Sequence, residues 1–340
     1  MSAPVGRKYV LITAAHNEEA YVERTLQSVV AQVQKPLKWV VVNDRSTDRT
    51  GPIVEAYAKQ YEFIELVEAR GEQGRGFSSK VHALSLGYQR LQGLDYDFLG
   101  ILDGDISFDP QYYSELLAKF SLDPKLGLCG GFIYEEERGE FQSRKPNTPL
   151  SVAGATQVFR RECYEAIGGL RPIPYGGEDW CAEVGVRMRG WKVQAFPELK
   201  AFHHRATGTG GSLLRYLYRQ GKMDYALGSL PSFEIVKCAR RVMENPFVLN
   251  AAARWTGFCV SSLRRAPRLV SKEFIDYLRE EQRQRLRAMI RAGSKAPEFN
   301  SSVDKPVQKT LGSAPSHDCV AGDTGKSSPL AAPQYNQWAS

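Results

Sequence analysis

Short apolar runs alternate with segments of helical periodicity across the first two hundred residues, and this alternation constrains the fold most. An uninterrupted apolar run of about four to eight residues is typical of a strand that is covered on both faces. We expect such strands at 9–12, 38–43, 63–67 and 97–102, with helices between them at 18–33, 50–60 and 78–91. Strand and helix in alternation predict an α/β fold with a doubly wound parallel sheet and helices on both of its faces.

The rest of the 340-residue chain changes character twice. The stretch up to about residue 202 is less regular and predicts strands at 126–134, 151–159 and 191–196 and helices at 161–167 and 179–189. Residues 213–291 have an almost wholly helical pattern, and residues 292–340 are rich in Ser, Pro, Gly and Lys, which is typical of a disordered tail. We therefore predict a sheet domain over 1–212, a helical extension over 213–291 and a disordered tail over 292–340.

Positive charge is concentrated in the helical extension. The whole chain has 45 Lys and Arg against 38 Asp and Glu, a formal net charge of +7, and residues 213–291 alone contain 16 against 7. This excess favours an anionic partner. The moderately apolar run 246–263 is flanked by arginines and is too interrupted to span a bilayer, but it suits a helix lying on an anionic membrane surface. The alternative is a helical subdomain that packs on the sheet.

The N-terminal residues and the cysteines predict the compartment. No secretory signal is visible, and no stretch reaches about 18 uninterrupted apolar residues. The six cysteines form no C-x-x-C pair, which disfavours a zinc or redox site. We expect a cytoplasmic protein with reduced thiols, peripheral at the cytoplasmic face of a membrane.

Polar clusters follow three of the expected strands directly. They are Ala14–Glu19, Asn43–Asp48 and Asp103-Gly104-Asp105. Ligands of an open parallel sheet bind beyond the carboxyl ends of its strands, so these clusters predict one shared site. Single clusters of this kind often only cap the following helix, and Ser46, Thr47 or Asp48 suits that purpose as well.

The loops also exclude two common nucleotide-binding classes. The first strand is followed by Ala-Ala-His-Asn-Glu-Glu, without the G-x-G-x-x-G of a dinucleotide oxidoreductase, and no Walker A loop is present. Asp103 and Asp105 instead lie two residues apart at a strand end, with a glycine between them. Paired carboxylates suit Mg²⁺ or Mn²⁺, which can bridge to a diphosphate.

Four motifs together resemble the family 2 glycosyltransferases, whose fold is called GT-A. They are Leu11–Glu19, Val41–Asp48, Leu102–Asp105 and Gly177-Glu178-Asp179-Trp180, within residues 8–205. The resemblance implies an inverting, metal-dependent transfer of sugar from a nucleotide sugar, UDP-linked by expectation, with residues 1–212 as the catalytic domain. The saccharide or lipid-linked acceptor would belong to surface polysaccharide assembly.

The resemblance also assigns roles to residues. The first two clusters would hold the nucleotide, through Ala14, Asn17, Glu18, Asn43 and Asp44, with Asp44 at the base. The family usually has Asp-Asp-Gly-Ser where this chain has Asn43-Asp44-Arg45-Ser46. Asp103 would lie by the ribose or the metal, and Asp105 would ligate the metal. Asp179 would be the general base, with Glu178 as its rival.

Further side chains extend the predicted site. His203 and His204 follow the last strand of the sheet, where the family often has a metal ligand, and we favour His203. Lys80 and Arg75 flank the loop after the third strand and suit phosphate, as does Arg205. A solvated surface is the alternative for these cations.

Two other functions compete with glycosyl transfer. A sugar nucleotidyltransferase would need a Gly-rich basic loop after the first strand, where this chain has none. A non-catalytic nucleotide-sugar-binding protein would not need Asp105 and Asp179. The Gln-x-x-Arg-Trp signature of processive synthases is absent, so we expect single additions. No aromatic-interleaved basic strand indicates a nucleic-acid partner.

Overall fold

The computed structural model of the chain describes residues 7–70, 77–137, 139–205, 213–240, 242 and 247–291. The described residues all belong to one compact unit within residues 1–301. The whole of the predicted tail, 292–340, lies outside the described residues. The predicted boundaries at residues 212 and 291 stay predictions.

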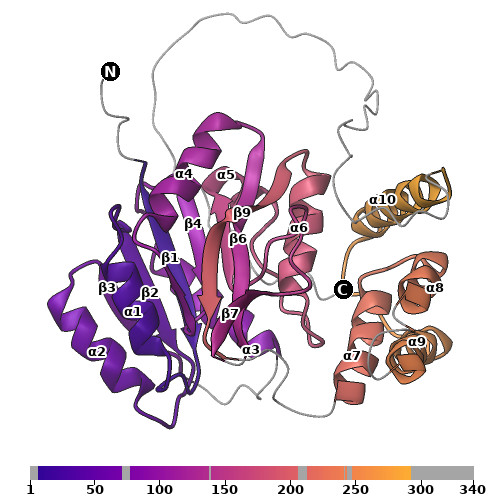
Figure 1. Cartoon of the computed structure of the whole chain (residues 1–340), viewed down its shortest axis with the longest axis horizontal. Helices are drawn as coiled ribbons and strands as arrows, with labels where there is room; N and C mark the ends of the chain where they lie inside the picture. Colours follow the sequence, from indigo (N-terminus) through magenta and orange to yellow (C-terminus); the bar gives the residue numbers. More distant parts are fainter. Residues whose placement is uncertain are drawn as a thin grey trace, which may run out of the picture. The chain divides into compact units, whose positions relative to one another are not determined.

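The first four predicted strands form the parallel half of the central sheet (Figure 1). They are β1 (Tyr9–Ala15), β2 (Lys38–Asn43), β3 (Ile64–Glu68) and β4 (Phe98–Leu102), in the order β3-β2-β1-β4. The connecting helices are α1 (Val22–Val30), α2 (Thr50–Gln60) and α3 (Phe77–Gln89). The α/β prediction is confirmed here, and all three clusters follow strands whose carboxyl ends lie at one edge.

The second half of the sheet is mixed rather than parallel, which corrects the expectation of a parallel sheet. Strand β8 (Thr156–Arg160) pairs antiparallel with β4 and with β6 (Leu126–Glu137), and β9 (Lys192–His203) pairs parallel with β6. Two short strands, β5 (Ile106–Phe108) and β7 (Glu140–Ser143), and the helix α4 (Tyr112–Leu122) were not among the predicted elements. The register of β9 shifts around Pro197, so the strand continues past this residue to His203.

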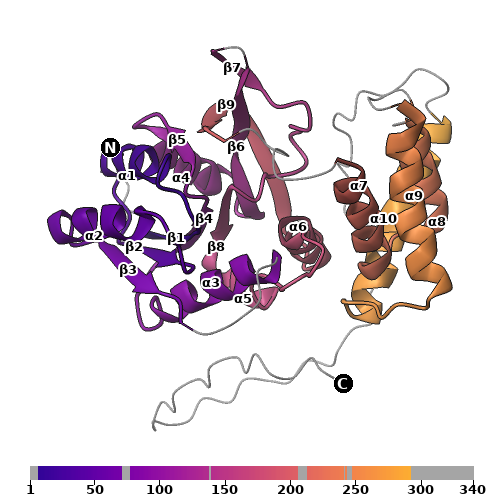
Figure 2. The same ribbon diagram turned by 90° about the horizontal axis from the view of Figure 1, so that it is seen from below.

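Helices cover both faces of the sheet because its strands are buried on both sides (Figure 2). Leu11 and Val41 pack with α1, α2 and α4. Val10 and Val40, one residue away on the same strands, pack on the other face with α3, α5 (Arg161–Ala166) and α6 (Glu178–Met188). The alternation of the strand side chains thus fixes which helices lie on which face.

The helical extension consists of α7 (Leu213–Ala226), α8 (Pro231–Arg240), α9 (Phe247–Leu263) and α10 (Lys272–Arg291), as the pattern predicts. Helices α7 and α9 cross closely, because Gly221 faces the Arg254 carbonyl and Gly257 faces the Tyr218 carbonyl. These two contacts show that the helices run antiparallel.

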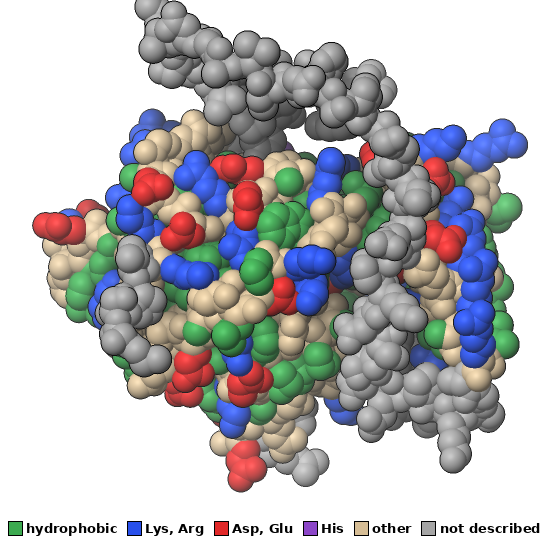
Figure 3. All heavy atoms as spheres, turned by 90° about the horizontal axis from the view of Figure 1, so that it is seen from above, with side chains coloured by type: hydrophobic (Ala, Val, Ile, Leu, Met, Phe, Trp, Pro, Cys, Tyr) green, Lys and Arg blue, Asp and Glu red, His purple; other side chains and the backbone are tan. Residues whose placement is uncertain are grey.

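The extension packs on the sheet domain through α6. Met223 and Phe274 join Val184 of α6 in one apolar cluster, and Arg187 Nε lies 3.1 Å from Glu281 Oε1. Figure 3 shows Lys and Arg side chains gathered on the extension, in the part that Figure 1 labels α10. Among the residues described here, no helix is both long and apolar enough to cross a membrane.

Candidate active site

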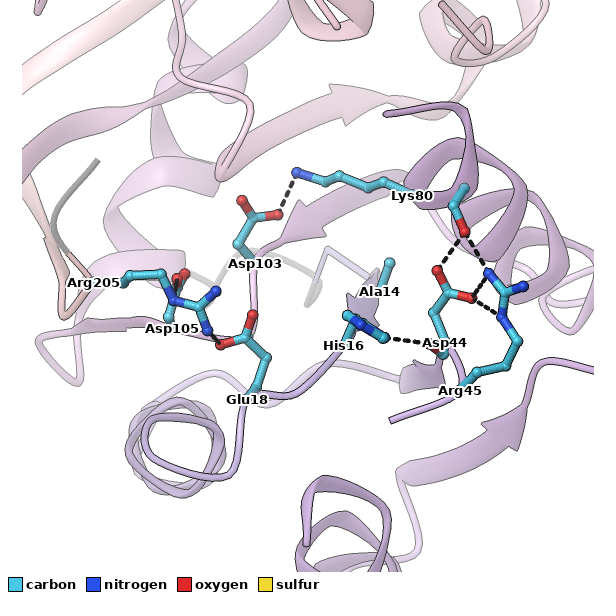
Figure 4. Close-up of a pocket in the computed structure, with 11 residues that line it drawn as sticks. Ala14, His16, Glu18, Asp44, Arg45, Lys80, Asp103, Asp105 and Arg205 are labelled. Carbon is cyan, nitrogen blue, oxygen red and sulfur yellow. Dashed lines mark hydrogen bonds and ion pairs between the residues drawn. The ribbon is translucent and has the colours of Figure 1, made fainter. Parts of the chain in front are cut away.

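A pocket of about 570 Å³ lies at the carboxyl ends of β1, β2 and β4 (Figure 4). This is the edge at which ligands of open α/β sheets bind, and the volume lies in the range of small-molecule sites. The loops after the three strands, the start of α3 and the end of β9 supply its lining residues. They are Ala14, His16, Glu18, Asp44, Arg45, Ser79, Lys80, Asp103, Gly104, Asp105 and Arg205.

One end of the pocket is built around the Asp44 carboxylate. Arg45 Nε donates to Asp44 Oδ1 at 2.9 Å, and Ser79 Oγ donates to Oδ2 at 2.6 Å. Arg45 has a φ of 56°, a left-handed conformation that turns its side chain back on its neighbour. His16 Nδ1 donates to the Asp44 carbonyl at 2.6 Å.

Asn17 and Asn43 do not line this pocket but tie its loops together. Asn17 Oδ1 accepts from the Thr47 backbone N–H at 2.8 Å, which joins the loops after β1 and β2. The Asn43 amide donates to Glu68 Oε2 at 2.9 Å, and its Oδ1 accepts from the Ser46 N–H. Their side chains brace the loops that carry Glu18 and Asp44.

Lys80 spans the pocket from the start of α3 to Asp103. Its Nζ lies 2.6 Å from Asp103 Oδ1 (Figure 4). Burial lowers the pKa of Lys80, but the charges of Asp103, Glu178 and Asp179 outweigh it and hold the pKa above its usual range. Lys80 is therefore a cation that faces the Asp103 cluster and the first turn of α6 together.

The other end of the pocket contains Asp105 and His203. Asp105 is 6% exposed, and its Oδ2 lies 3.2 Å from His203 Nε2, while its Oδ1 is buried without a hydrogen-bond partner in the described residues. Burial raises the pKa of Asp105, but the hydrogen bond and charge of His203 outweigh this and lower it. His204 instead bonds Ser107 Oγ at 2.8 Å, so His203 is the one that faces Asp105.

Arg205 places a guanidinium beside the same acidic groups. It pairs with Glu18, and its Nε lies 3.6 Å from Asp105 Oδ2. Burial and the nearby Asp105 charge raise the pKa of Glu18 to about 8, against the opposing effect of Arg205. In the described part of the chain, no group of three or more His, Cys, Asp or Glu side chains is placed so that it could hold a metal ion by itself.

Glu178 and Asp179 begin α6, after Gly177 at a φ of 88°. They do not line the pocket, but their charges act on Lys80, which does. Burial, together with the charge of Asp179, raises the pKa of Glu178. The buried Gln157 holds this turn, since its Nε2 donates to the Asp179 carbonyl at 3.4 Å.

The structure therefore brings most of the predicted site residues together. Ala14, Glu18, Asp44, Lys80, Asp103 and Asp105 line one pocket, with His203 on Asp105. Arg75 lies outside the described residues. Sequence reasoning missed His16 and Ser79. His16 stands in the motif after β1, but neither its bond to a backbone carbonyl nor the contact of Ser79 with Asp44 leaves a sequence pattern.

Comparisons with known proteins agree with this architecture. Residues 10–174 match the family model Glycosyl transferase family 2. The probable glycosyltransferase YdaM of Bacillus subtilis (strain 168) is 32% identical over 215 residues, 56% of this chain and 49% of that protein. The poly-beta-1,6-N-acetyl-D-glucosamine synthase of Staphylococcus aureus (strain COL) is 31% identical over 124 residues, 35% of this chain and 27% of that protein. The chain thus spans half or less of the length of these relatives.

A solved structure shares the fold over most of both chains. The mannosyltransferase PcManGT from Pyrobaculum calidifontis, solved with GDP-Man and Mn²⁺, has a TM-score of 0.52 and 18% identity, covering 85% of this chain and 88% of that one. The family match over residues 10–174 and the shared fold are together consistent with a family 2 glycosyltransferase domain of GT-A fold.

Proposed function

We propose that the protein transfers a sugar from a nucleotide-sugar donor, UDP-linked, to a hydroxyl of a saccharide or lipid-linked acceptor in surface polysaccharide assembly. The observation that carries the proposal is the shared pocket of Asp44, Lys80, Asp103 and Asp105. Asp44 would bind the base at one end, and Lys80 would meet the diphosphate near Asp103. The names of the curated relatives, a probable glycosyltransferase and a polysaccharide synthase, support this reading.

The residues at the Asp105 end fit a Mn²⁺ or Mg²⁺ ion. The buried Asp105 Oδ1 has no hydrogen-bond partner in the described residues, and Asp105 and His203 offer a carboxylate and an imidazole side by side. Such ions are commonly held by one or two protein groups, with substrate phosphates and water completing the shell. When bound, the ion would neutralise charge on the departing diphosphate.

The base for the reaction would come from the first turn of α6. Asp179 would accept the proton of the acceptor hydroxyl while that oxygen bonds to the anomeric carbon and the bond to the diphosphate oxygen breaks. The nucleoside diphosphate leaves with the electron pair of that bond, and attack from the opposite face inverts the configuration. Glu178 is the rival base, and its raised pKa favours proton uptake.

The test pairs donor binding with turnover. A thermal-shift panel of nucleotide sugars with Mn²⁺ identifies the donor, and release of nucleoside diphosphate in the presence of saccharide acceptors measures transfer. We expect Asp179→Asn and Asp105→Asn to abolish transfer, and Glu178→Gln to retain more of it than Asp179→Asn. Donor binding with no transfer or hydrolysis by the wild type across the panel would support a non-catalytic binding protein instead. Wild-type rates of transfer by both Asp179→Asn and Asp105→Asn would refute the proposal.

We also propose that the protein attaches peripherally to an anionic membrane surface through one end of the α7/α9 pair. Leu213 and Leu214 begin α7 and are 49% and 42% exposed, while Leu263 ends the antiparallel α9 and is 84% exposed. Arg264 and Arg265 follow directly and are exposed. We call these five residues the α7–α9 tip. Exposed apolar side chains beside arginines suit the headgroup region of an anionic bilayer.

A further inference from the structure

One face of α7 lies beside the turn that begins α6. Gly177 faces Met223 so closely that a Cβ on this glycine would overlap the Met223 side chain. The preceding residue of α7, Lys222, places its Nζ 4.8 Å from the centre of the Tyr175 ring. Tyr175 stands three residues before Glu178, so this end of α7 adjoins the proposed base.

The face is basic and aromatic along its length. Arg215, Tyr218, Arg219 and Lys222 follow at the spacing i, i+3, i+4, i+7, which puts them on one side of a helix. We call these four residues, together with Tyr175, the α7 basic face. The one acid of α7, Asp224, is 1% exposed and bound by Lys237 and Arg254, away from this face. The α7 basic face therefore has three cations and no carboxylate of its own.

Two of these cations, Arg215 and Lys222, have no carboxylate partner among the described residues, and Lys222 contacts the rings of Tyr175 and Tyr218 instead. Like charges at i and i+4, as in Arg215 and Arg219, weaken a helix slightly. A row of cations at such a position favours an anionic ligand.

We propose that the α7 basic face binds the anionic group of the acceptor, and that the acceptor is a saccharide carrying a phosphate close to the hydroxyl that receives the sugar. The inference rests on the proposed glycosyl transfer and names its acceptor class. The face extends about 10 Å from Arg215 to Lys222. It ends at Tyr175, in the turn that precedes α6. A phosphate held there leaves the sugar ring near Glu178 and Asp179, with the Tyr175 and Tyr218 rings as apolar surfaces for it.

The test measures binding of α-D-glucose 1-phosphate to the full chain, with methyl α-D-glucoside as the uncharged probe. We expect the double variant Arg215→Gln/Lys222→Met to weaken the phosphate ester about tenfold and to leave the glucoside unchanged. The single variant Lys222→Arg keeps a cation at this position and leaves Arg215 intact, so it should bind the phosphate ester as the wild type does. Arg287→Gln on α10 removes a remote cation, 64% exposed, and should have no effect.

Two further arms separate the sources of a phosphate signal. Loss of ester binding in Lys80→Met, but not in the double variant, would place the ester in the donor pocket and overturn the inference. So would a double variant that loses phosphatidylglycerol vesicles but keeps the ester, or a wild type that binds no ester. UDP binding with Mn²⁺ is measured in parallel: a wild type that binds no nucleotide across the donor panel defeats the proposed function itself.

Discussion

Gly154 lies against the carboxylate of Asp179. A Cβ atom added to Gly154 would be 2.8 Å from Asp179 Oδ2 and 2.9 Å from Asp179 Cβ. Real Cβ atoms do not approach other atoms this closely, so an alanine at 154 would force Asp179 or its turn to move. The loop before β8 thereby sets the position of the proposed base.

Gly154→Ala should lower the rate of transfer by about 10- to 100-fold, because small displacements of a catalytic group are costly. Donor affinity should stay unchanged, since Gly154 does not line the pocket of Asp44 and Asp105 that is proposed to hold the donor. The matched control is Gly185→Ala on α6, where an added Cβ would make ordinary contact with Ile167 at 3.5 Å. Steady-state kinetics of both variants check the split between kcat and donor KM, and equal kcat in the two would contradict the prediction.

Removing the metal or its proposed ligand should have one common effect. Chelation by EDTA and the variant Asp105→Asn should each reduce transfer at least 100-fold, because the leaving diphosphate loses its counter-charge. Readdition of Mn²⁺ should restore the wild type but not the variant. Asp95→Asn makes the same change at an exposed ion pair and should behave as wild type. The electron paramagnetic resonance signal of free Mn²⁺, titrated with protein and UDP, reports binding without activity.

The parallel half of the fold could be predicted from the sequence because its strands are short apolar runs with helical spacing between them. Helix α4 was equally predictable, since Tyr113, Leu116 and Phe120 follow helical spacing, yet it is absent from the expected elements. Strand β5 has three residues and pairs with the distant β9. The direction of β8 and β6 likewise depends on long-range pairing, which no local period encodes.

The residues of the candidate site also fall into those that the sequence predicts and those that depend on long-range pairing. Asp103, Asp105, Glu178 and Asp179 could be picked out from the sequence, because they lie at the ends of elements that the apolar pattern already locates. The contact that selects His203 over His204 depends on the pairing of β9 with β5, where Ile106 lies opposite His203. The roles of Asn17 and Asn43 as loop braces became visible only with both loops in place.

The buried Glu183 should make stability depend on pH. This side chain of α6 is 1% exposed, its Oε1 accepts from the Val152 N–H and Ser151 Oγ, and burial raises its pKa to about 7 from a usual 4.5. The folded protein therefore holds the proton more tightly than the unfolded chain. Its stabilising effect is fully present below about pH 4.5 and is lost as pH rises to about 7.

Urea unfolding at several pH values tests this expectation. Between pH 4.5 and 7 the free energy of unfolding of the wild type should fall by about 3 kcal/mol relative to Glu183→Gln, whose side chain does not titrate. Above pH 7 the two curves should run parallel. Curves that are parallel throughout would mean that Glu183 stays charged in the fold.

The helical extension contains a buried ionic cluster whose loss should be costly. Arg254 of α9 is 4% exposed, pairs with Asp224 and lies 2.8 Å from Glu234 Oε1. Arg254→Met should lower the free energy of unfolding by about 3–5 kcal/mol, because it leaves buried carboxylates short of positive charge. Arg283→Met breaks an exposed pair with Glu280 and should cost less than about 1 kcal/mol. Urea unfolding of the two variants, measured side by side, tests this difference in the free energy of unfolding.

Attachment to an anionic bilayer should depend on both kinds of side chain in the α7–α9 tip. In flotation at low salt, phosphatidylglycerol vesicles should retain the wild type and neutral phosphatidylcholine vesicles should not, because the arginines act through charge. Arg264→Gln/Arg265→Gln should weaken retention and its salt dependence, while Leu263→Ser should weaken retention with the salt dependence kept. Arg283→Gln/Arg287→Gln on α10 removes equal charge elsewhere and should float as wild type. Equal recovery with both lipids, or identical loss in the α10 variant, would assign the attachment to something other than the tip.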